Sequence, residues 1–278
     1  YSFSDDLQFL VLVDSVRDES QKNKKIEIAS LKIYETSPLQ YQSVVGLAPH
    51  LPAQVAFVAA RRFLQLDGSK ANVWELQKVT IEGKEKQRWQ IISQVQTLFQ
   101  ISRMSFSDNL IALLSKDSSR GESCVSLVDR QSLQFRHRVG IDAPVSKLVF
   151  DHNSRHFAAL TDEGRVQVFK LRKETGYQAH WALDLKGVRA VERNEAVSNQ
   201  FFVLANKEER SQGSEVRLYQ FSRPLNLVMI WRPLFEVRQI RFVTLTGEGS
   251  RQRKVQFLLM VNKNKQTQKI YCGIKRPE

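Results

Sequence analysis

With 278 residues, a formal net charge of +13 and a pI near 9.8, the chain is strongly basic and long enough for one repeat-built domain. Hydrophobic residues make up 42% of it, enough for a packed core, and no apolar run reaches the roughly 18 residues that a membrane helix needs. The composition therefore excludes a helical membrane protein. It favours a soluble globular chain with an anionic partner, for which nucleic acid is the first candidate.

The two cysteines and the first residue set further limits. Cys124 and Cys272 lie far apart in strand-like apolar segments, which excludes a disulfide framework and a thiolate zinc site and fits a reducing compartment. The sequence begins at Tyr1 without an initiator methionine or a leader pattern, so we expect it to be a piece of a longer polypeptide.

Short apolar segments separated by turn residues recur about every 45 residues, a period typical of propeller blades. In chain order the predicted strands are 7–13 and 25–33; 55–58, 62–66 and 71–76; 110–115 and 124–129; 145–150, 156–161, 165–171 and 177–185; 188–191, 200–205 and 215–221; and 237–243, 254–261 and 268–273. Their apolar residues alternate or cluster in short runs rich in Val, Ile, Phe and Thr, which indicates strands rather than helices. The pattern predicts an all-β fold of about six partial blades.

Two turn motifs carry a family resemblance. Phe-Ser-Asp follows the first strand of two copies, at residues 3–5 and 106–108, and Asp-Glu-Gly precedes the third strand at 162–164. These motifs are similar to those of the WD-repeat family at the same places, and the resemblance covers nearly the whole chain. The family's Gly-His is absent, and its Trp-Asp is replaced by Phe169-Lys170, Val128-Asp129 and Trp74-Glu75.

The resemblance implies a divergent WD-repeat-like β-propeller in a single domain, 1–278. It implies a ring of about seven blades once flanking sequence is included, and the loss of most of the family's His-to-Asp hydrogen-bond network. In style the chain is similar to the propeller subunits of the nucleolar small-subunit ribosome-assembly particle.

Residues that could carry catalysis or bind metal do not gather in the sequence. His152 and His156 have a spacing that suits a metal on a helix, but here they flank a turn into a strand with no third ligand nearby. Ser4-Asp5-Asp6 and Ser107-Asp108-Asn109 fall where the repeat needs turns, and Gly247-Glu248-Gly249 lacks the lysine of a phosphate loop. We therefore predict no catalytic residue, metal, cofactor or small-molecule substrate, and no enzymatic activity.

Clusters of lysine and arginine are the main functional signal. They fall in polar segments that include 14–24, 116–123, 208–214 and 247–253, which we expect to join second to third strands and so to lie on one face. Cationic side chains there could track RNA without reading its bases, although lysine-rich loops also block edge pairing of strands. The predicted RNA-binding residues are Lys22, Lys24, Lys25, Lys84, Lys86, Arg88, Arg251, Arg253, Lys254, Lys263 and Lys265.

Trp89, Trp181 and Trp231 lie in or before expected outer strands, where they serve either protein docking or packing between blades. The leading hypothesis is a non-catalytic scaffold of a nucleolar ribonucleoprotein assembly in ribosome biogenesis, with other subunits on its faces and RNA on its basic loops. The alternative is a chromatin, transcription or nuclear-pore scaffold that binds proteins or DNA. Fold alone does not separate the two hypotheses.

Overall fold

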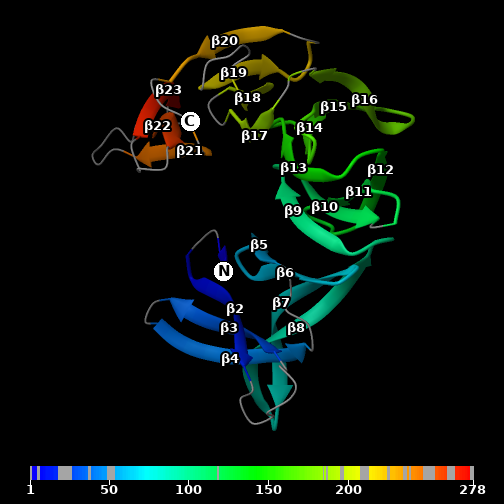
Figure 1. Ribbon diagram of the computed structural model, residues 1–278. Helices are drawn as coiled ribbons and strands as arrows, with labels where there is room; N and C mark the ends of the chain where they lie inside the picture. The colour runs from blue at the N-terminus through cyan, green and yellow to red at the C-terminus, as the bar shows by residue number, and fades with distance from the viewer. Residues whose placement is uncertain are drawn as a thin grey trace. The chain divides into compact units, whose positions relative to one another are not determined.

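The computed structural model shows small antiparallel sheets built from consecutive strands (Figure 1). It describes residues 2–4, 7–17, 27–36, 39–48, 54–117, 119–183, 185, 187–194, 197–206, 213–223, 226–233, 237, 239–246, 254–261 and 267–275. In residues 3, 13–17, 27–30, 39–48, 239 and 241–275 of these, only the backbone is described. Within this part of the chain no helix has the length and hydropathy that a membrane span requires.

Two sheets come from the first third of the chain. Their strands, in order, are β1 (Ser2–Phe3), β2 (Phe9–Arg17), β3 (Glu27–Thr36) and β4 (Leu39–Ala48), then β5 (Val55–Ala59), β6 (Arg62–Asp67), β7 (Lys70–Ile81) and β8 (Lys84–Gln96). In each sheet every strand pairs antiparallel with the next. Each sheet is therefore a four-stranded meander.

The later strands repeat this plan. They are β9 (Ile101–Phe106), β10 (Leu110–Asp117), β11 (Glu122–Asp129) and β12 (Phe135–Ile141); β13 (Val145–Phe150), β14 (His156–Thr161), β15 (Val166–Arg172) and β16 (Gly176–Leu183); β17 (Val188–Arg193), β18 (Gln200–Asn206), β19 (Ser214–Gln220) and β20 (Leu227–Trp231); and β21 (Gln239–Thr246), β22 (Lys254–Val261) and β23 (Thr267–Lys275). The last three form a three-stranded sheet among the described residues. The predicted all-β fold class, with small antiparallel sheets as its units, is confirmed.

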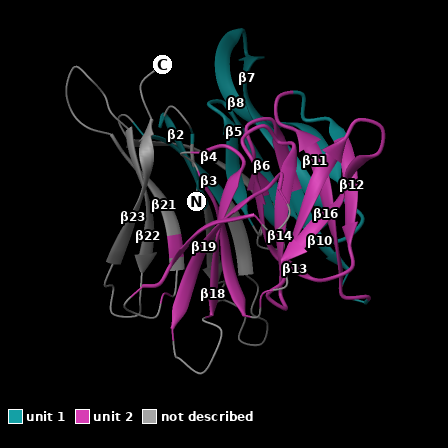
Figure 2. Ribbon diagram, turned by 90° about the horizontal axis from the view of Figure 1, so that it is seen from above, with its two compact units in different colours: residues 1–104, 113–119, 132–135 teal, residues 105–112, 120–131, 136–278 magenta. Residues whose placement is uncertain are grey.

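The chain divides into two compact units (Figure 2). Unit 1 holds residues 1–104, 113–119 and 132–135, and unit 2 holds 105–112, 120–131 and 136–278. The prediction of one domain over 1–278 remains a prediction.

The second strand of a sheet shows why neighbouring sheets are needed. All six residues of β14 are buried, although successive side chains of a strand point to opposite faces. On one face Phe157 stacks on Phe169, with ring centroids 4.6 Å apart. On the other face Ala158 and Leu160 join a core that includes Phe201 of the next sheet. Phe169 belongs to the same sheet as Phe157, so it is the complete burial of β14 that shows both faces of this strand to be covered.

A buried polar residue closes the first turn of four sheets. Ser4 Oγ accepts a hydrogen bond from the Phe9 amide at 2.9 Å, and Ser107 Oγ accepts one from the Leu110 amide at 2.9 Å. Asp151 Oδ1 accepts one from the Arg155 amide at 2.8 Å, and the Asn194 amide donates to the Gln200 carbonyl at 3.0 Å. The predicted turn role of the Ser-Asp motifs is confirmed for their serines, since side chains of this kind satisfy local backbone groups.

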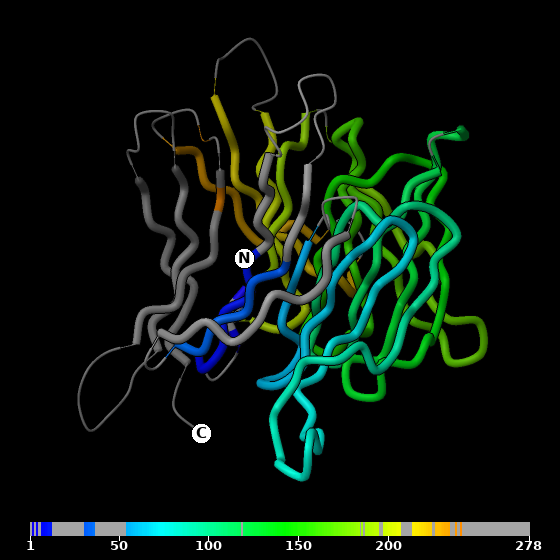
Figure 3. Tube along the Cα trace, turned by 90° about the horizontal axis from the view of Figure 1, so that it is seen from below, coloured from blue at the N-terminus to red at the C-terminus, as the bar shows by residue number. Residues whose placement is uncertain are grey.

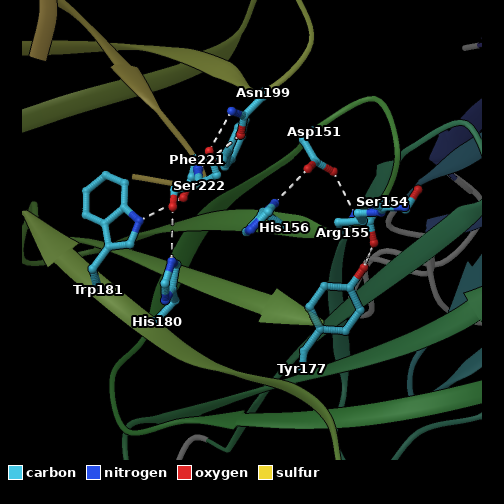
Figure 4. A network of polar contacts seen from close by, with 10 residues as sticks. All are labelled: Asp151, Ser154, Arg155, His156, Tyr177, His180, Trp181, Asn199, Phe221 and Ser222. Carbon is cyan, nitrogen blue, oxygen red and sulfur yellow. Dashed lines mark hydrogen bonds and ion pairs between the residues drawn. The ribbon is translucent and has the colours of Figure 1, made fainter. Parts of the chain in front are cut away.

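Polar contacts in unit 2 link one sheet to the next (Figure 4). Trp181 Nε1 of β16 donates to the Phe221 carbonyl at 2.8 Å, and His180 Nε2 lies 3.4 Å from the Ser222 carbonyl oxygen. Ser222 is held in turn by Asn199, whose Oδ1 accepts from the Ser222 amide at 3.0 Å. These bonds tie β16 to the segment between β19 and β20.

A second part of the same network lies inside one sheet. His156 Nδ1 is 2.8 Å from Asp151 Oδ2, and the Tyr177 hydroxyl donates to the Ser154 carbonyl (Figure 4). Burial raises the pKa of Tyr177 well above its ordinary value, and the nearby Asp151 charge adds to the effect. The pair of His156 and Asp151 fixes a local turn, so His156 has the structural role that the sequence favoured.

The tryptophans pack between sheets, as the simpler of the two interpretations predicted. Trp89 of β8 is buried against Phe9 of β2, with ring centroids 5.6 Å apart, and against Phe63 of β6. Trp181 lies in the same core as Phe201 of the next sheet, and Trp231 packs against a core that includes Ile240 of β21. Inter-sheet packing therefore accounts for these aromatic side chains.

Gly164, at the β14–β15 turn, lies where this sheet comes close to β17 of the next sheet. Gly164 has φ +78, and a Cβ there would lie 2.9 Å from the Val188 carbonyl oxygen. Gly121 also has positive φ, +68, but nothing lies within 4 Å of its Cβ position. We expect Gly164→Ala to lower the unfolding free energy by about 3 kcal/mol, from left-handed strain plus a backbone clash, and Gly121→Ala by about 1 kcal/mol, from strain alone. Urea unfolding of both variants measures the difference, and equal losses would contradict the contact at Val188.

Candidate nucleic-acid interface

The β7–β8 hairpin extends past the rest of its sheet (Figures 1 and 3). Its register runs without interruption from Trp74 opposite Ile91 to Ile81 opposite Lys84 at the tip. Only Glu82 and Gly83 form the turn, with φ of 53 and 75, and positive φ at both central residues defines the tight turn that suits hairpin twist. Residues 82–88 are all exposed.

The base of the hairpin is fixed in the core of unit 1. Trp74 and Trp89 are buried with Phe63, and Trp74 Nε1 donates to Gln65 Oε1 at 2.7 Å. Arg62 of β6 forms an ion pair with Glu75 of β7, and the hydrogen bond from Arg62 is the main reason that the pKa of Glu75 lies below its ordinary value. The exposed tip is therefore carried on a rigid base.

The two faces of the tip differ in charge. Lys84, Lys86 and Arg88 are at alternate positions of β8 and so share one face, opposite Ile81, Val79 and Gln77 of β7. Glu85 points to the other face, where its carboxylate lies 3.3 Å from Lys78 Nζ. We call Lys84, Lys86 and Arg88 the cationic face. Its residues have no ion-pair partner among the described residues.

The spacing of the cationic face suits a row of phosphates. Alternate residues of a strand are about 6.6 Å apart, so three positive charges span roughly 13 Å. Cations presented this way neutralise the phosphates of a nucleic acid and release counterions, which gives affinity without base readout. Val79 and Ile81, the apolar residues opposite Lys86 and Lys84, have no side-chain hydrogen-bond donor or acceptor with which to recognise a base.

Three of the eleven predicted RNA-binding residues are thus brought together, but on a strand. The sequence interpretation placed Lys84, Lys86 and Arg88 in a loop, and this was wrong because the Glu82-Gly83 turn lets both flanking segments pair along their whole length. Lys254 begins β22, and its side chain is not described. The remaining candidates lie outside the described residues: Lys22, Lys24, Lys25, Arg251, Arg253, Lys263 and Lys265.

One predicted loop position is also corrected. Residues 247–253 connect β21 to β22, and β21 is the first strand of its sheet, because it contacts β17, the first strand of the preceding sheet. The segment 207–213 instead connects a second to a third strand, β18 to β19. Successive connections of an antiparallel meander alternate between its two ends. The four polar segments named above therefore do not all lie at one end of their sheets.

A groove of about 1230 Å³ lies in unit 2 between β12 and the β15–β16 hairpin. Arg120, Arg138 and Arg165 line it together with Asp142 and Glu163. Arg165 Nε is 3.6 Å from Glu163 Oε2, and both side chains are exposed. Because both signs of charge line the groove, its electrostatics do not select an anion as clearly as the cationic face does.

The remaining chemistry-bearing residues are dispersed. His152 Nε2 lies 3.2 Å from the Asn194 carbonyl oxygen, and His137 packs against Gly176. Cys124 is a buried free thiol, while Cys272 is in β23 with its side chain not described. The described residues contain no group of three or more His, Cys, Asp or Glu side chains suited to a metal ion.

The sequence interpretation missed one surface. The outer strand β20 exposes Leu227, Val228 and Met229, and no functional role was predicted for them. The available signal was the run of five apolar residues at 227–231 inside a segment, 216–235, that contains no acidic residue.

Comparison with known proteins supports the fold of this chain but does not assign it to a family. No protein-family model matches the sequence, and no curated protein matches it. Among solved structures, Sqt1 from Chaetomium thermophilum matches with a TM-score of 0.59 and 11% identity, over 95% of this chain and 68% of that chain. Chaetomium thermophilum Sqt1 bound to the N-terminus of the ribosomal protein L10 matches with a TM-score of 0.54 and 12% identity, over 94% and 83%.

Hydrazine synthase of Kuenenia stuttgartiensis also matches, with a TM-score of 0.57 and 10% identity, over 99% of this chain and 83% of that chain. These likenesses agree with the WD-repeat-like β-propeller fold that the sequence predicted. At such low identity they show a shared fold between proteins of different activity.

The lowered pKa of Glu75 makes the base of the hairpin sensitive to acid. A carboxyl group whose folded pKa is depressed adds stability above its unfolded pKa and loses it as the pH falls through the folded pKa. Glu75→Gln should therefore lower the unfolding free energy by about 1 kcal/mol at pH 7 and by much less at pH 3. Urea midpoints at the two pH values measure this, with Glu163→Gln in an exposed pair as the control. A loss that is equal at both pH values would contradict the role given to the Arg62 bond.

Proposed function

We propose that this chain is a non-catalytic propeller scaffold that contacts RNA and binds other subunits of a large ribonucleoprotein assembly. We place this assembly in the nucleus, in the nucleolus, with a role in ribosome biogenesis. The observation that carries the RNA contact is the cationic face of the β7–β8 hairpin, where Lys84, Lys86 and Arg88 are exposed on one face and Glu85 between them is turned to the other. The net charge of +13 agrees with an anionic partner.

The protein-binding part of the proposal draws on the fold. A structure that shares the fold holds the N-terminus of the ribosomal protein L10, which supports a protein partner and a setting in ribosome assembly. The nucleolar location and the role in pre-rRNA processing are proposals that rest on this analogy and on the basic charge. A chromatin, transcription or nuclear-pore scaffold is the competing function, and the experiments below separate the two.

Charge reversal on the cationic face tests the RNA contact. The variant Lys84→Glu, Lys86→Glu, Arg88→Glu changes three exposed side chains, so the fold should be kept. We expect weaker binding of single-stranded RNA and a salt dependence, log K against log salt, that is shallower by about 2, since each lost phosphate contact removes roughly 0.7. Fluorescence anisotropy across a salt series measures both.

The matched control reverses Lys170, Arg172 and Lys173 near the β15–β16 turn. Both triple variants lower the net charge from +13 to +7, because each reversal changes it by two units. If the control loses as much RNA affinity and slope as the hairpin variant, total charge and not the cationic face binds RNA. Tighter binding of duplex DNA than of RNA would favour the chromatin function.

Crosslinking of the full-length protein in cells tests its setting. We expect recovery of pre-ribosomal RNA together with nucleolar proteins, and we expect the cationic-face variant to recover less of that RNA while keeping its protein partners. Sequencing of bound RNA and mass spectrometry of bound proteins provide the readout. Recovery of chromatin or pore proteins without RNA would overturn the proposed function.

A further inference from the structure

The outer edge of the β17–β20 sheet is apolar. β20 is the last strand in its sheet order and pairs with β19 alone. Leu227, Val228 and Met229 are consecutive in this strand and are 38%, 40% and 50% exposed. An edge strand presents unpaired backbone N–H and C=O groups, so apolar side chains there leave a site at which another strand can pair.

Two of the other outer strands, β8 and β12, are protected by charge, whereas β4 and β16, like β20, contain no Lys, Arg, Asp or Glu. In β12 the exposed residues include Arg136 and Arg138, and in β8 they include the cationic face. Natural sheets use such charges at their edges to prevent pairing with other chains. The five residues of β20 have none. The edge of β20 is therefore open to strand addition where the edges of β8 and β12 are blocked.

β20 is held firmly in its sheet in spite of its exposure. Its register with β19 runs from Val216 opposite Trp231 to Tyr219 opposite Leu227, with a bulge that places Val228 between two paired positions. Trp231 packs on Phe202, with ring centroids 6.0 Å apart. The exposed apolar side chains thus belong to an ordered strand with a fixed edge.

The ends of the strand are positively charged. Residues 216–235 contain Arg217, Arg223 and Arg232 and no acidic residue, and Arg223 and Arg232, on either side of β20, are exposed. The Glu215 carboxylate, only 5% exposed, lies 3.0 Å from Arg232 Nε and 2.9 Å from an Arg217 nitrogen. One carboxylate against two guanidinium groups leaves an excess of positive charge at this end.

The same contacts fix the charge state of Glu215. Burial alone would raise the pKa of Glu215, but hydrogen bonds from Arg232 and Arg217 outweigh it and the net direction is down. The Arg232 side chain remains 66% exposed, so it can meet a second carboxylate.

We propose that the edge of β20 binds an extended segment of a partner protein, apolar at its centre and acidic at its ends, which adds to the sheet as a further strand. Main-chain hydrogen bonds to the edge would supply affinity. The bulge at Val228 places Leu227 and Met229 on opposite faces of the sheet, so side chains from both faces of the added strand would pack on them. Arg223 and Arg232 would receive the acidic ends. The inference deepens the proposed scaffold function and rests on it.

A synthetic peptide probes this chemistry directly. The probe is a fluorescein-labelled Asp-Asp-Val-Thr-Val-Thr-Val-Asp-Asp, compared with a peptide that has Lys at its four flanking positions and with one that is N-methylated at alternate residues. The first should bind the whole chain, and each of the others should bind roughly tenfold more weakly, through charge repulsion or loss of edge hydrogen bonds. Binding should also slow hydrogen exchange of β20 amides.

Paired variants locate the site. Val228→Lys with Met229→Lys places charge on the edge and should weaken peptide binding by roughly tenfold or more. Ile91→Lys with Ile92→Lys makes the same change on exposed residues of β8 and should leave it unchanged. Circular dichroism checks that both variants fold. Peptide and RNA affinities are measured on the same samples. If the cationic-face variant loses RNA binding but the native chain does not bind the peptide, this inference fails and the proposed function stands. If the native chain binds the peptide but the cationic-face variant keeps its RNA affinity, the proposed RNA contact fails instead.

Three results would overturn the inference. These are absence of binding by the acid-flanked peptide, equal binding of the N-methylated peptide, and unchanged binding by the β20 variant. Sedimentation tests the remaining occupant: if the native chain self-associates and the β20 variant does not, the edge pairs with a second copy and the acidic partner is wrong.

Discussion

The burial of inner strands on both faces of their sheets, as in β14, is the constraint on which the rest of the described structure depends. In β14 all six side chains are buried: on one face Phe157 lies beside Phe150, Phe169 and Tyr177 of its own sheet, and on the other face the core includes Phe201 of the next sheet. A meander of four short strands cannot cover itself in this way, so it is stable only beside similar sheets. This requirement explains the repeat, and it places the aromatic residues of outer strands, Trp89 and Trp181, at the contacts between sheets.

The two proposed binding surfaces consequently lie on outer strands. The inner strand β14 has no free face, and Lys147 of β13 is paired with Glu192 of β17. An outer strand has one edge in solvent, so its side chains can vary without loss of the core. The cationic face and the β20 edge both use this freedom, the first by extending a hairpin beyond the sheet and the second by leaving the edge without charge.

The sequence predicted inner strands better than outer ones for the same reason. His156–Thr161 was predicted with the bounds that the structure has, because a strand buried on both faces has a continuous apolar run, here 157–160, and is bounded by turn residues. β8 begins with Lys-Glu-Lys-Gln-Arg and was interpreted as a loop, since an exposed strand has lost its apolar pattern. The basic residues were chosen correctly by type, but their common face follows from the strand register, which depends on the two-residue turn at Glu82-Gly83.

The distribution of charge is the observation that best supports the proposed anionic partner. Basic residues close to the cores are neutralised locally: Arg62 pairs with Glu75 and Arg217 with Glu215. Pairing of this kind uses acidic residues where burial makes an uncompensated charge costly. With 42 basic and 29 acidic residues in the chain, the excess must then be carried by exposed segments, where an unpaired charge costs little and a phosphate can reach it. Lys84, Lys86 and Arg88 show this arrangement in its simplest form, because the one acidic residue among them, Glu85, is turned to the opposite face and paired with Lys78.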